Sequence, residues 1–293
     1  MVKKEVINRF DITALQDSFS ESAMAAACPK EYWRKPTYVE YVRNRNPWEG
    51  ITIFTDKQLH LAPEVDSTYK VAILQEPREL LPWAYQTIVQ FEDEYDLILT
   101  YDIELINRGK NYVFCPGDTA AIRTEGCKVH DKTKLISFPY SLKTQLFGHR
   151  LRHIIVNDVL PTLNLNYKID FFGAGVGNFV DDKLETLQDY MFQIATENVK
   201  KEYYYTDKIL DCLITGTVPI YWGPDNISNF FNPKGILQFK SPEELKGILN
   251  NLTKEKYHEM MPYIKENYEA AKYYMIQDDF FYDIIKKGLK DNG

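Results

Sequence analysis

Short apolar runs alternate with amphipathic stretches over most of the chain, and this alternation is typical of α/β proteins. In the first part of the chain, apolar runs predict strands at residues 5–7, 51–55, 69–74, 97–100 and 112–114. The stretches between them predict helices at residues 81–91 and 103–107. Because strands and helices take turns along the chain, we expect a mainly parallel sheet.

The same alternation continues in the second part of the chain. It predicts strands at residues 134–138, 168–172, 191–195, 217–222 and 237–239, and helices at 148–160, 207–215, 242–251 and throughout 253–290. Thr206 is a good N-cap for the helix that begins at Asp207, and Gly216 stands where a C′ glycine ends a helix. Ser241 and Glu244 predict a capping box at the following helix.

These elements predict an α/β fold of two Rossmann-like units that face each other across a cleft. Gly126 and a run of charges interrupt the pattern, so we expect one domain over 1–130, a second over 131–275 and a C-terminal helix over 276–293. Ligands of open parallel sheets bind beyond the carboxyl ends of the strands. The polar residues that follow predicted strands are Glu76, Asp102, Asn198 and the turn 206–208. Their shared position favours a site in the cleft.

Composition narrows the class of protein. The chain has 293 residues, of which 44% are hydrophobic and 26% charged, as in globular proteins. Its net charge of −7 argues against nucleic acid as the main partner. The four cysteines form no C-x-x-C pair, which favours a reducing compartment without structural zinc. No apolar stretch is long enough for a signal peptide or a membrane span, so we expect a cytoplasmic protein and leave peripheral membrane contact open.

Aromatic residues are abundant, with 21 Tyr and 4 Trp. Such rings fill cores and also stack on sugars, and we expect most of these to lie in the core. The aromatic and basic segment 29–48 fits either an irregular packed loop or part of a surface for an acceptor sugar.

The turn before the helix at Asp207 has the chemistry of an anion site. A helix N-terminus offers unpaired N–H groups and a positive dipole end, and Lys208 adds a full charge. Tyr204, Asp207 and Asn198 surround the turn with groups suited to a ribose or a sugar. The pattern therefore fits a pocket for a nucleotide diphosphate sugar, and it equally fits an ordinary α/β packing unit with a solvated lysine.

Metal and dinucleotide chemistry have weaker support. There is no D-x-D sequence, a usual device for holding a metal–diphosphate, so we expect a metal-independent reaction without a cofactor. His149 and His153 lie four residues apart on one helical face, but no third ligand accompanies them. The glycines of segment 173–177 imitate a dinucleotide fingerprint with the third glycine one position early.

The central stretch resembles the core motif of the α-1,3-fucosyltransferase family, glycosyltransferase family 10. The matching residues are Glu197-Asn198, then Tyr204-Tyr205-Thr206-Asp207-Lys208, then Val218-Pro219-Ile220-Tyr221-Trp222-Gly223, and finally Asn232-Pro233-Lys234-Gly235. The resemblance is specific over about residues 135–245. It implies a GT-B arrangement with the acceptor side first and the donor side second, and a last helix that returns to the first domain. It also implies an inverting transfer of fucose from GDP-fucose to a hydroxyl of a glycan.

Inverting transfer needs a base for the acceptor hydroxyl and positive groups for the leaving diphosphate. The resemblance places Glu76, after an apolar strand and before Pro77, as the base. The alternative is that Glu76 simply ends its strand and faces water. Asp102 is the second candidate for the base. Arg152 and Lys208 are the expected phosphate clamps. The remaining candidates are Arg150 as a substitute for Arg152, Asn198, Tyr204 and Asp207 as donor contacts, and Glu197 and Thr206 from the same motif.

The chain also departs from the family pattern. Asp207 replaces a glutamate that is one methylene longer, and Lys200, Lys201 and Tyr203 replace loop glycines. A donor other than GDP-fucose is therefore an alternative. The rival functions are a non-catalytic carbohydrate- or nucleotide-binding protein with the same fold, and a nucleotide-sugar-modifying enzyme, for which the sequence shows no nicotinamide or metal site. The whole pattern is closest to a divergent, soluble bacterial or viral branch of the family.

Overall fold

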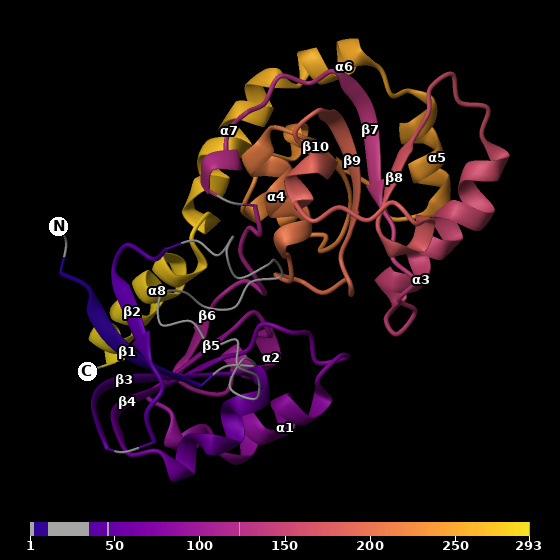
Figure 1. Ribbon diagram of the computed structural model, residues 1–293. Helices are drawn as coiled ribbons and strands as arrows, with labels where there is room; N and C mark the ends of the chain where they lie inside the picture. The colour runs from indigo at the N-terminus through magenta and orange to yellow at the C-terminus, as the bar shows by residue number, and fades with distance from the viewer. Residues whose placement is uncertain (1–2, 11–34, 46, 123, 293) are drawn as a thin grey trace. The chain divides into compact units, whose positions relative to one another are not determined.

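The computed structural model describes residues 3–10, 35–45, 47–122 and 124–292 (Figure 1). The chain divides into two compact units. The first unit combines Met1–Thr119 with Ile276–Gly293, and the second is Ala120–Met275. Most of the first half of the aromatic segment 29–48 lies outside the described residues.

The first unit is built on a six-stranded sheet with the order β2-β1-β3-β4-β5-β6, in which all strand pairs are parallel. The strands are β1 (Glu5–Phe10), β2 (Val39–Val42), β3 (Trp48–Thr55), β4 (Ser67–Ile73), β5 (Leu97–Thr100) and β6 (Tyr112–Phe114). The helices are α1 (Pro82–Gln90), α2 (Ile103–Ile106) and the C-terminal α8 (Gln277–Asn292), with a 3₁₀ segment, η3 (Asp56–Glu64), after β3. Helix α8 packs against β2 and β5.

The second unit is built on a five-stranded parallel sheet with the order β11-β10-β9-β7-β8. Its strands are β7 (Lys134–Pro139), β8 (Asp170–Phe172), β9 (Tyr190–Thr196), β10 (Val218–Trp222) and β11 (Leu237–Gln238). Its helices are α3 (Phe147–Ile154), α4 (Asp207–Thr215), α5 (Pro242–Asn250), α6 (Lys254–Glu259) and α7 (Met261–Ala271). The apolar faces of these elements form the core around β9 and β10.

Each sheet has a point where the strand order reverses. In the second unit, β7 pairs with β8 on one side and with β9 on the other. In the first unit, β1 pairs with β2 and with β3. Side chains beyond the carboxyl ends of the strands at such switch points are where open α/β sheets hold ligands.

Several local predictions needed correction. Strand β2 lies in the segment 29–48, for which we expected an irregular loop and no strand. The apolar pattern there is weak because only alternate residues of this short edge strand are buried. The helix expected over 148–160 ends as an α-helix at Ile154 and continues as one π-helical turn, Ile155–Val159. The stretch 253–290 is broken into α6, α7 and α8. Pro262 lies in the first turn of α7, the part of a helix that accepts proline.

The predicted caps form, with one change of partner. Thr206 accepts from the Lys208 N–H at the start of α4, and Gly216 ends that helix with φ 73°. Ser241 accepts from the Glu244 N–H, but the Glu244 carboxylate bonds the N–H of Lys240 instead of completing the capping box on Ser241.

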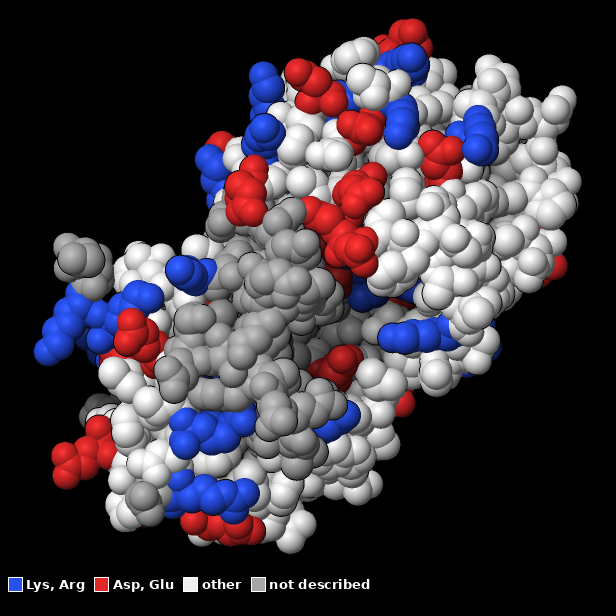
Figure 2. All heavy atoms as spheres, viewed as in Figure 1, with Lys and Arg blue, Asp and Glu red and all other residues white. Residues whose placement is uncertain are grey.

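Among the described residues, no helix is both long enough and apolar enough to cross a membrane. On the face shown in Figure 2, acidic and basic side chains are interspersed.

Replacement of Gly216 by Ala should destabilise the protein by about 1–3 kcal/mol, because a side chain is strained at positive φ and a Cβ there would lie 2.7 Å from Val129 Cγ1. Gly247→Ala is the matched control, because this position in α5 has open space around it and alanine favours a helix by up to about 1 kcal/mol. Urea unfolding of the two variants should move in opposite directions; a shift of the same sign and size would contradict the assignment of the cap.

Candidate functional site

A buried glutamate lies at the carboxyl end of β9. The Glu197 carboxylate accepts hydrogen bonds from the backbone N–H and the hydroxyl of Thr206, at 3.0 and 2.8 Å, and from the Tyr221 hydroxyl at 2.9 Å. The Lys208 ammonium lies 3.7 Å away. Burial raises the pKa of Glu197, while Lys208 and the two hydroxyls act in the opposite direction. Because Glu197 has no exposed surface, it acts on a ligand only through the groups that it holds.

The turn before α4 presents a lysine at a helix N-terminus. The Thr206 hydroxyl oxygen accepts from the Lys208 N–H at 3.4 Å and from the Lys208 ammonium at 3.0 Å. The Lys208 side chain nevertheless keeps 22% of its surface exposed. The ammonium and the helix dipole therefore both favour an anion at this turn.

Arg152 reaches the same strand end from α3. Its Nε donates to the Thr196 hydroxyl and its Nη2 to the Thr196 carbonyl, both at 2.7 Å. Its Nη1 makes no hydrogen bond with the residues that the structure describes. Burial lowers the pKa of Arg152, and the charges of Glu197 and Asp207 oppose this decrease, so the guanidinium stays charged. Arg152 and Lys208 thus lie beside consecutive residues of one strand end, with both N–H groups of Arg152 Nη1 still available.

The start of α3 is pressed against the residues that follow β9. The Gly148 N–H donates to the Asn198 carbonyl at 3.0 Å, and a Cβ on Gly148 would collide with the carbonyl of Glu197. Only glycine allows this close approach of two backbones. The contact holds α3, and with it Arg152, against the end of β9.

His149 helps to orient the Asn198 side chain. Its Nδ1 accepts from the Leu146 N–H at 3.3 Å, and the ring also hydrogen-bonds Asn198. Burial, followed by the nearby cations Arg152 and Lys208, lowers the pKa of His149 to about 4. The ring is therefore neutral at neutral pH, and the bonding of Nδ1 as an acceptor leaves Nε2–H as the donor.

A second charge network holds the first turn of α4. The Lys183 ammonium lies 2.5 Å from Asp207 Oδ2 and 2.6 Å from Asp211 Oδ2. Asp211 is fully buried, and its Oδ1 accepts from the N–H groups of Ala121 and Ile122. Burial alone would raise the pKa of Asp207, but the charges of Lys183 and Lys208 outweigh it and lower that pKa overall. Asp207 is therefore ionised and already paired.

Sequence reasoning missed four residues of this arrangement, which are Gly148, His149 as an orienting group, Lys183 and Asp211. Asp207 and Asp211 stand four residues apart on one helical face, and such a like-charge pair requires a cation nearby. That spacing was a usable signal. No local pattern indicates Lys183, which precedes Asp207 by 24 residues and lies in the short 3₁₀ segment Lys183–Thr186.

Three further residues of the predicted set or its loop take distinct positions. Tyr204 is 1% exposed and belongs to the packed wall of the site. Arg150 is exposed, and its Nη1 donates to the carbonyls of Thr144 and Gln145, away from Thr196. Tyr203, where the family pattern has a glycine, keeps a left-handed backbone with φ 67°. The loop therefore retains the glycine-type conformation while carrying a large aromatic side chain.

In the first unit, Glu76 follows β4 and is half-buried. The Tyr85 hydroxyl donates to its backbone carbonyl at 2.9 Å, and Tyr85 also bonds the Tyr101 hydroxyl. Asp102, the second base candidate, accepts from the N–H groups that begin α2 and from Arg78 Nη2 at 2.9 Å. Asp102 therefore already serves as a helix cap and an ion-pair partner, whereas Glu76 stands at the end of its strand.

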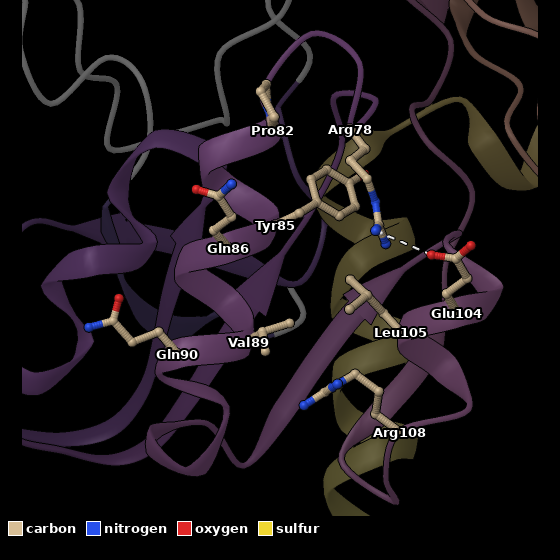
Figure 3. Close-up of a pocket in the computed structure, with 9 residues that line it drawn as sticks. All are labelled: Arg78, Pro82, Tyr85, Gln86, Val89, Gln90, Glu104, Leu105 and Arg108. Atoms are coloured by element: carbon tan, nitrogen blue, oxygen red, sulfur yellow. Dashed lines mark ion pairs between the residues drawn. The ribbon is translucent and has the colours of Figure 1, made fainter.

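A pocket of about 550 Å³ lies beside this network (Figure 3). In Figure 3, Arg78 extends past the Tyr85 ring toward Glu104, with which its Nη1 forms an ion pair at 3.2 Å. Gln86 and Gln90 from α1 form another part of the wall. An aromatic ring with amides and charged groups around it is a chemistry that suits a polar, ring-shaped ligand.

The described residues contain no group of three His, Cys, Asp or Glu side chains placed to hold a metal ion. The two histidines of α3 bond to protein groups: His149 to Leu146 and Asn198, and His153 to the Tyr140 hydroxyl and the Lys143 carbonyl.

Comparison with solved structures defines the class of fold. The chain is similar to an α1,3-fucosyltransferase solved with GDP, with a TM-score of 0.57 and 16% identity over 99% of this chain and 91% of that one. An α1,3-fucosyltransferase solved with GDP-fucose gives a TM-score of 0.51 and 16% identity over 86% and 81% of the two chains. The α/β fold of GT-B type is thereby confirmed.

Comparison of sequences finds a family match in the second part of the chain. Residues 141–283, just under half of the chain, match the family described as glycosyltransferase family 10 (fucosyltransferase) C-term. An α-(1,3)-fucosyltransferase of Helicobacter pylori is 38% identical over 72 residues, which is 24% of this chain and 15% of that protein. A putative fucosyltransferase-like protein of Arabidopsis thaliana is 33% identical over 93 residues, 31% of this chain and 18% of that protein. The matches thus span less than a fifth of either relative.

Replacement of Lys183 by Met should lower the free energy of unfolding by about 3–5 kcal/mol, because it leaves two carboxylates without their shared cation. Lys200→Met is the matched control. Its partner Asp225 keeps 52% of its side chain exposed, and loss of such a surface pair should change the free energy by less than about 1 kcal/mol. Urea denaturation of both variants measures the difference, and equal effects would contradict a buried network around Lys183.

Proposed function

We propose that the chain is an inverting, fucosyltransferase-like glycosyltransferase that moves a sugar, with fucose from GDP-fucose as the first choice, to a hydroxyl of a glycan. The observation that carries the proposal is that the part of the chain that matches family 10 also has two cations at the switch point of its sheet. Arg152 and Lys208 come from different helices and meet at the end of β9. Packing of the unit alone does not require two cations at the same strand end.

In this proposal the second unit binds the donor. Arg152 Nη1, the Lys208 ammonium and the N-terminus of α4 hold the diphosphate and stabilise the charge that develops on it as the sugar leaves. Asn198, oriented by His149, contacts the donor. Asp207 and Glu197 keep the Lys208 ammonium in place. Because fixed cations already face the diphosphate, the reaction does not require a metal ion.

The first unit supplies the base and the acceptor side. Glu76 takes the proton of the acceptor hydroxyl as the new bond forms on the opposite face of the donor sugar. The pocket beside Arg78 and Tyr85 gives this unit polar and aromatic groups that suit a sugar ring.

The nucleotide is tested by a thermal-shift panel of GDP, UDP, CDP, dTDP and ADP, each with magnesium and with a chelator. A ligand that binds only the folded state raises the melting temperature. We expect a selective increase with GDP that does not depend on metal. An increase with another nucleotide alone would indicate a donor with that base, as the change at Tyr203 in the loop allows. No increase with any nucleotide would favour a binding protein that does not use nucleotides.

Lys208→Ala should weaken GDP binding by about 10- to 100-fold, because a charge-assisted bond to phosphate contributes about 1.5–3 kcal/mol. Isothermal titration calorimetry measures the change, with circular dichroism to confirm folding. Lys168→Ala is the control, because the Lys168 side chain is 89% exposed and precedes β8, and this variant should bind GDP as the parent does. Unchanged affinity in Lys208→Ala would remove Lys208 from the site.

Glu76→Gln should bind GDP normally and lose about 10²- to 10⁴-fold in kcat, because the amide cannot take the acceptor proton. Asp102→Asn is the matched comparison, since an amide oxygen still caps α2. We expect Asp102→Asn to keep most of its activity in a GDP-fucose transfer assay. The opposite ranking of the two variants would assign the base role to Asp102.

A further inference from the structure

Asp56 occupies a strained position beside the predicted base. It directly follows β3, the strand next to the switch point of the first sheet, and its φ is 29°. Asp tolerates this left-handed region better than most residues, but the conformation still costs about 1 kcal/mol or more. Such a backbone persists only where the surroundings hold it in place.

The Asp56 side chain holds the segment that carries Glu76. Its Oδ1 accepts from the N–H of Gln75 at 3.0 Å and lies 3.4 Å from the N–H of Glu76. On the other side, the Tyr85 hydroxyl donates to the Glu76 carbonyl. The Glu76 backbone is therefore bonded by side chains from two different segments.

Asp56 and Glu76 also interact through their charges. The titratable groups that interact with Asp56 are Glu76 after β4, Lys57 next to it in the chain and Tyr85 on α1. The charges of Arg78 and Asp102 in turn act on Tyr85. Burial first and the Glu76 charge next raise the pKa of Asp56 to about 7, against the two backbone N–H bonds and Lys57. Two carboxyl groups that repel each other in this way do not both ionise until the pH is near neutral.

We propose that Asp56 is a positioning residue for Glu76, which it acts on by fixing the Glu76 backbone and by placing a second carboxylate next to the base. The inference rests on the proposed role of Glu76 in transfer. In that step the acceptor O–H bond breaks and its proton moves to Glu76, while the acceptor oxygen bonds the sugar carbon and the nucleoside diphosphate leaves with the electrons of the broken C–O bond. Asp56 touches none of the reacting atoms. When Asp56 loses its proton, the added negative charge increases the proton affinity of Glu76.

The first test needs no substrate. Carboxyl carbon NMR of the full chain labelled at Asp follows the titration of Asp56, whose signal is assigned by its absence in Asp56→Asn. We expect a midpoint near pH 7 in the parent chain and a lower midpoint in Glu76→Gln, because the neutral amide removes the like charge. An unshifted midpoint in Glu76→Gln would overturn the coupling, whether or not the chain transfers a sugar.

The second test measures kcat/KM against pH in the transfer assay. The parent rate should rise through about pH 7, and Asp56→Asn should lose that rise and be about 10-fold slower above it, while its amide oxygen still accepts the two N–H bonds. Asp56→Ala should be slower still because it loses those bonds. Asp66→Asn, at an exposed aspartate of the same unit, is the control. An active parent with the same profile in Asp56→Asn would overturn the positioning role, whereas an inactive parent would contradict the proposed transferase.

Discussion

The Glu197 carboxylate has no contact with water, and much of the second unit is arranged to satisfy it. A buried anion without partners would be strongly unfavourable, so its hydrogen bonds are obligatory rather than optional. Thr206 supplies two of them and Tyr221 supplies one, and Lys208 supplies the opposing charge. These partners come from β10 and from the start of α4. One charge thus fixes the relative position of the strand end and the helix that present the candidate phosphate-binding groups.

The two units use acidic side chains in opposite ways. In the second unit, Asp207 is surrounded by Lys183 and Lys208, which keep it ionised and leave its first turn rigid. In the first unit, burial and the charge of Glu76 act against ionisation of Asp56, and two backbone N–H groups and Lys57 favour it, so its pKa is about 7. The first arrangement suits a site that holds a diphosphate, and the second suits one that must accept a proton.

The strands and main helices could be predicted because apolar periodicity reports directly on burial in regular elements. The Thr206 cap and the Gly216 end of α4 could be predicted for the same reason: each depends on a residue and its immediate neighbours. The family motif also located the turn around Lys208. The edge strand β2 was missed because half of it faces solvent.

What the sequence could not provide were contacts between segments far apart in the chain. Lys183 forms an ion pair with Asp211, which follows it in the chain after strand β9, and no sequence pattern near Lys183 predicts that partner. The close approach of Gly148 to the backbone of Glu197 could not be predicted from the sequence either, because glycine also occurs at helix starts that no second backbone approaches. Asp56 became visible only when the structure brought the ends of β3 and β4 together. Such pairings depend on the order of strands in a sheet, which periodicity does not report.

The backbone contact at Gly148 limits how the second unit can adapt to a ligand. Because α3 rests on the carbonyls after β9 with no room for even a methyl group, this helix cannot slide or roll against the strand without breaking the Gly148 to Asn198 hydrogen bond. Any induced fit at Arg152 must therefore come from rotation about its own side-chain bonds and not from a shift of the helix. This part of the site is preorganised, so little of the binding energy is spent on rearranging the backbone there.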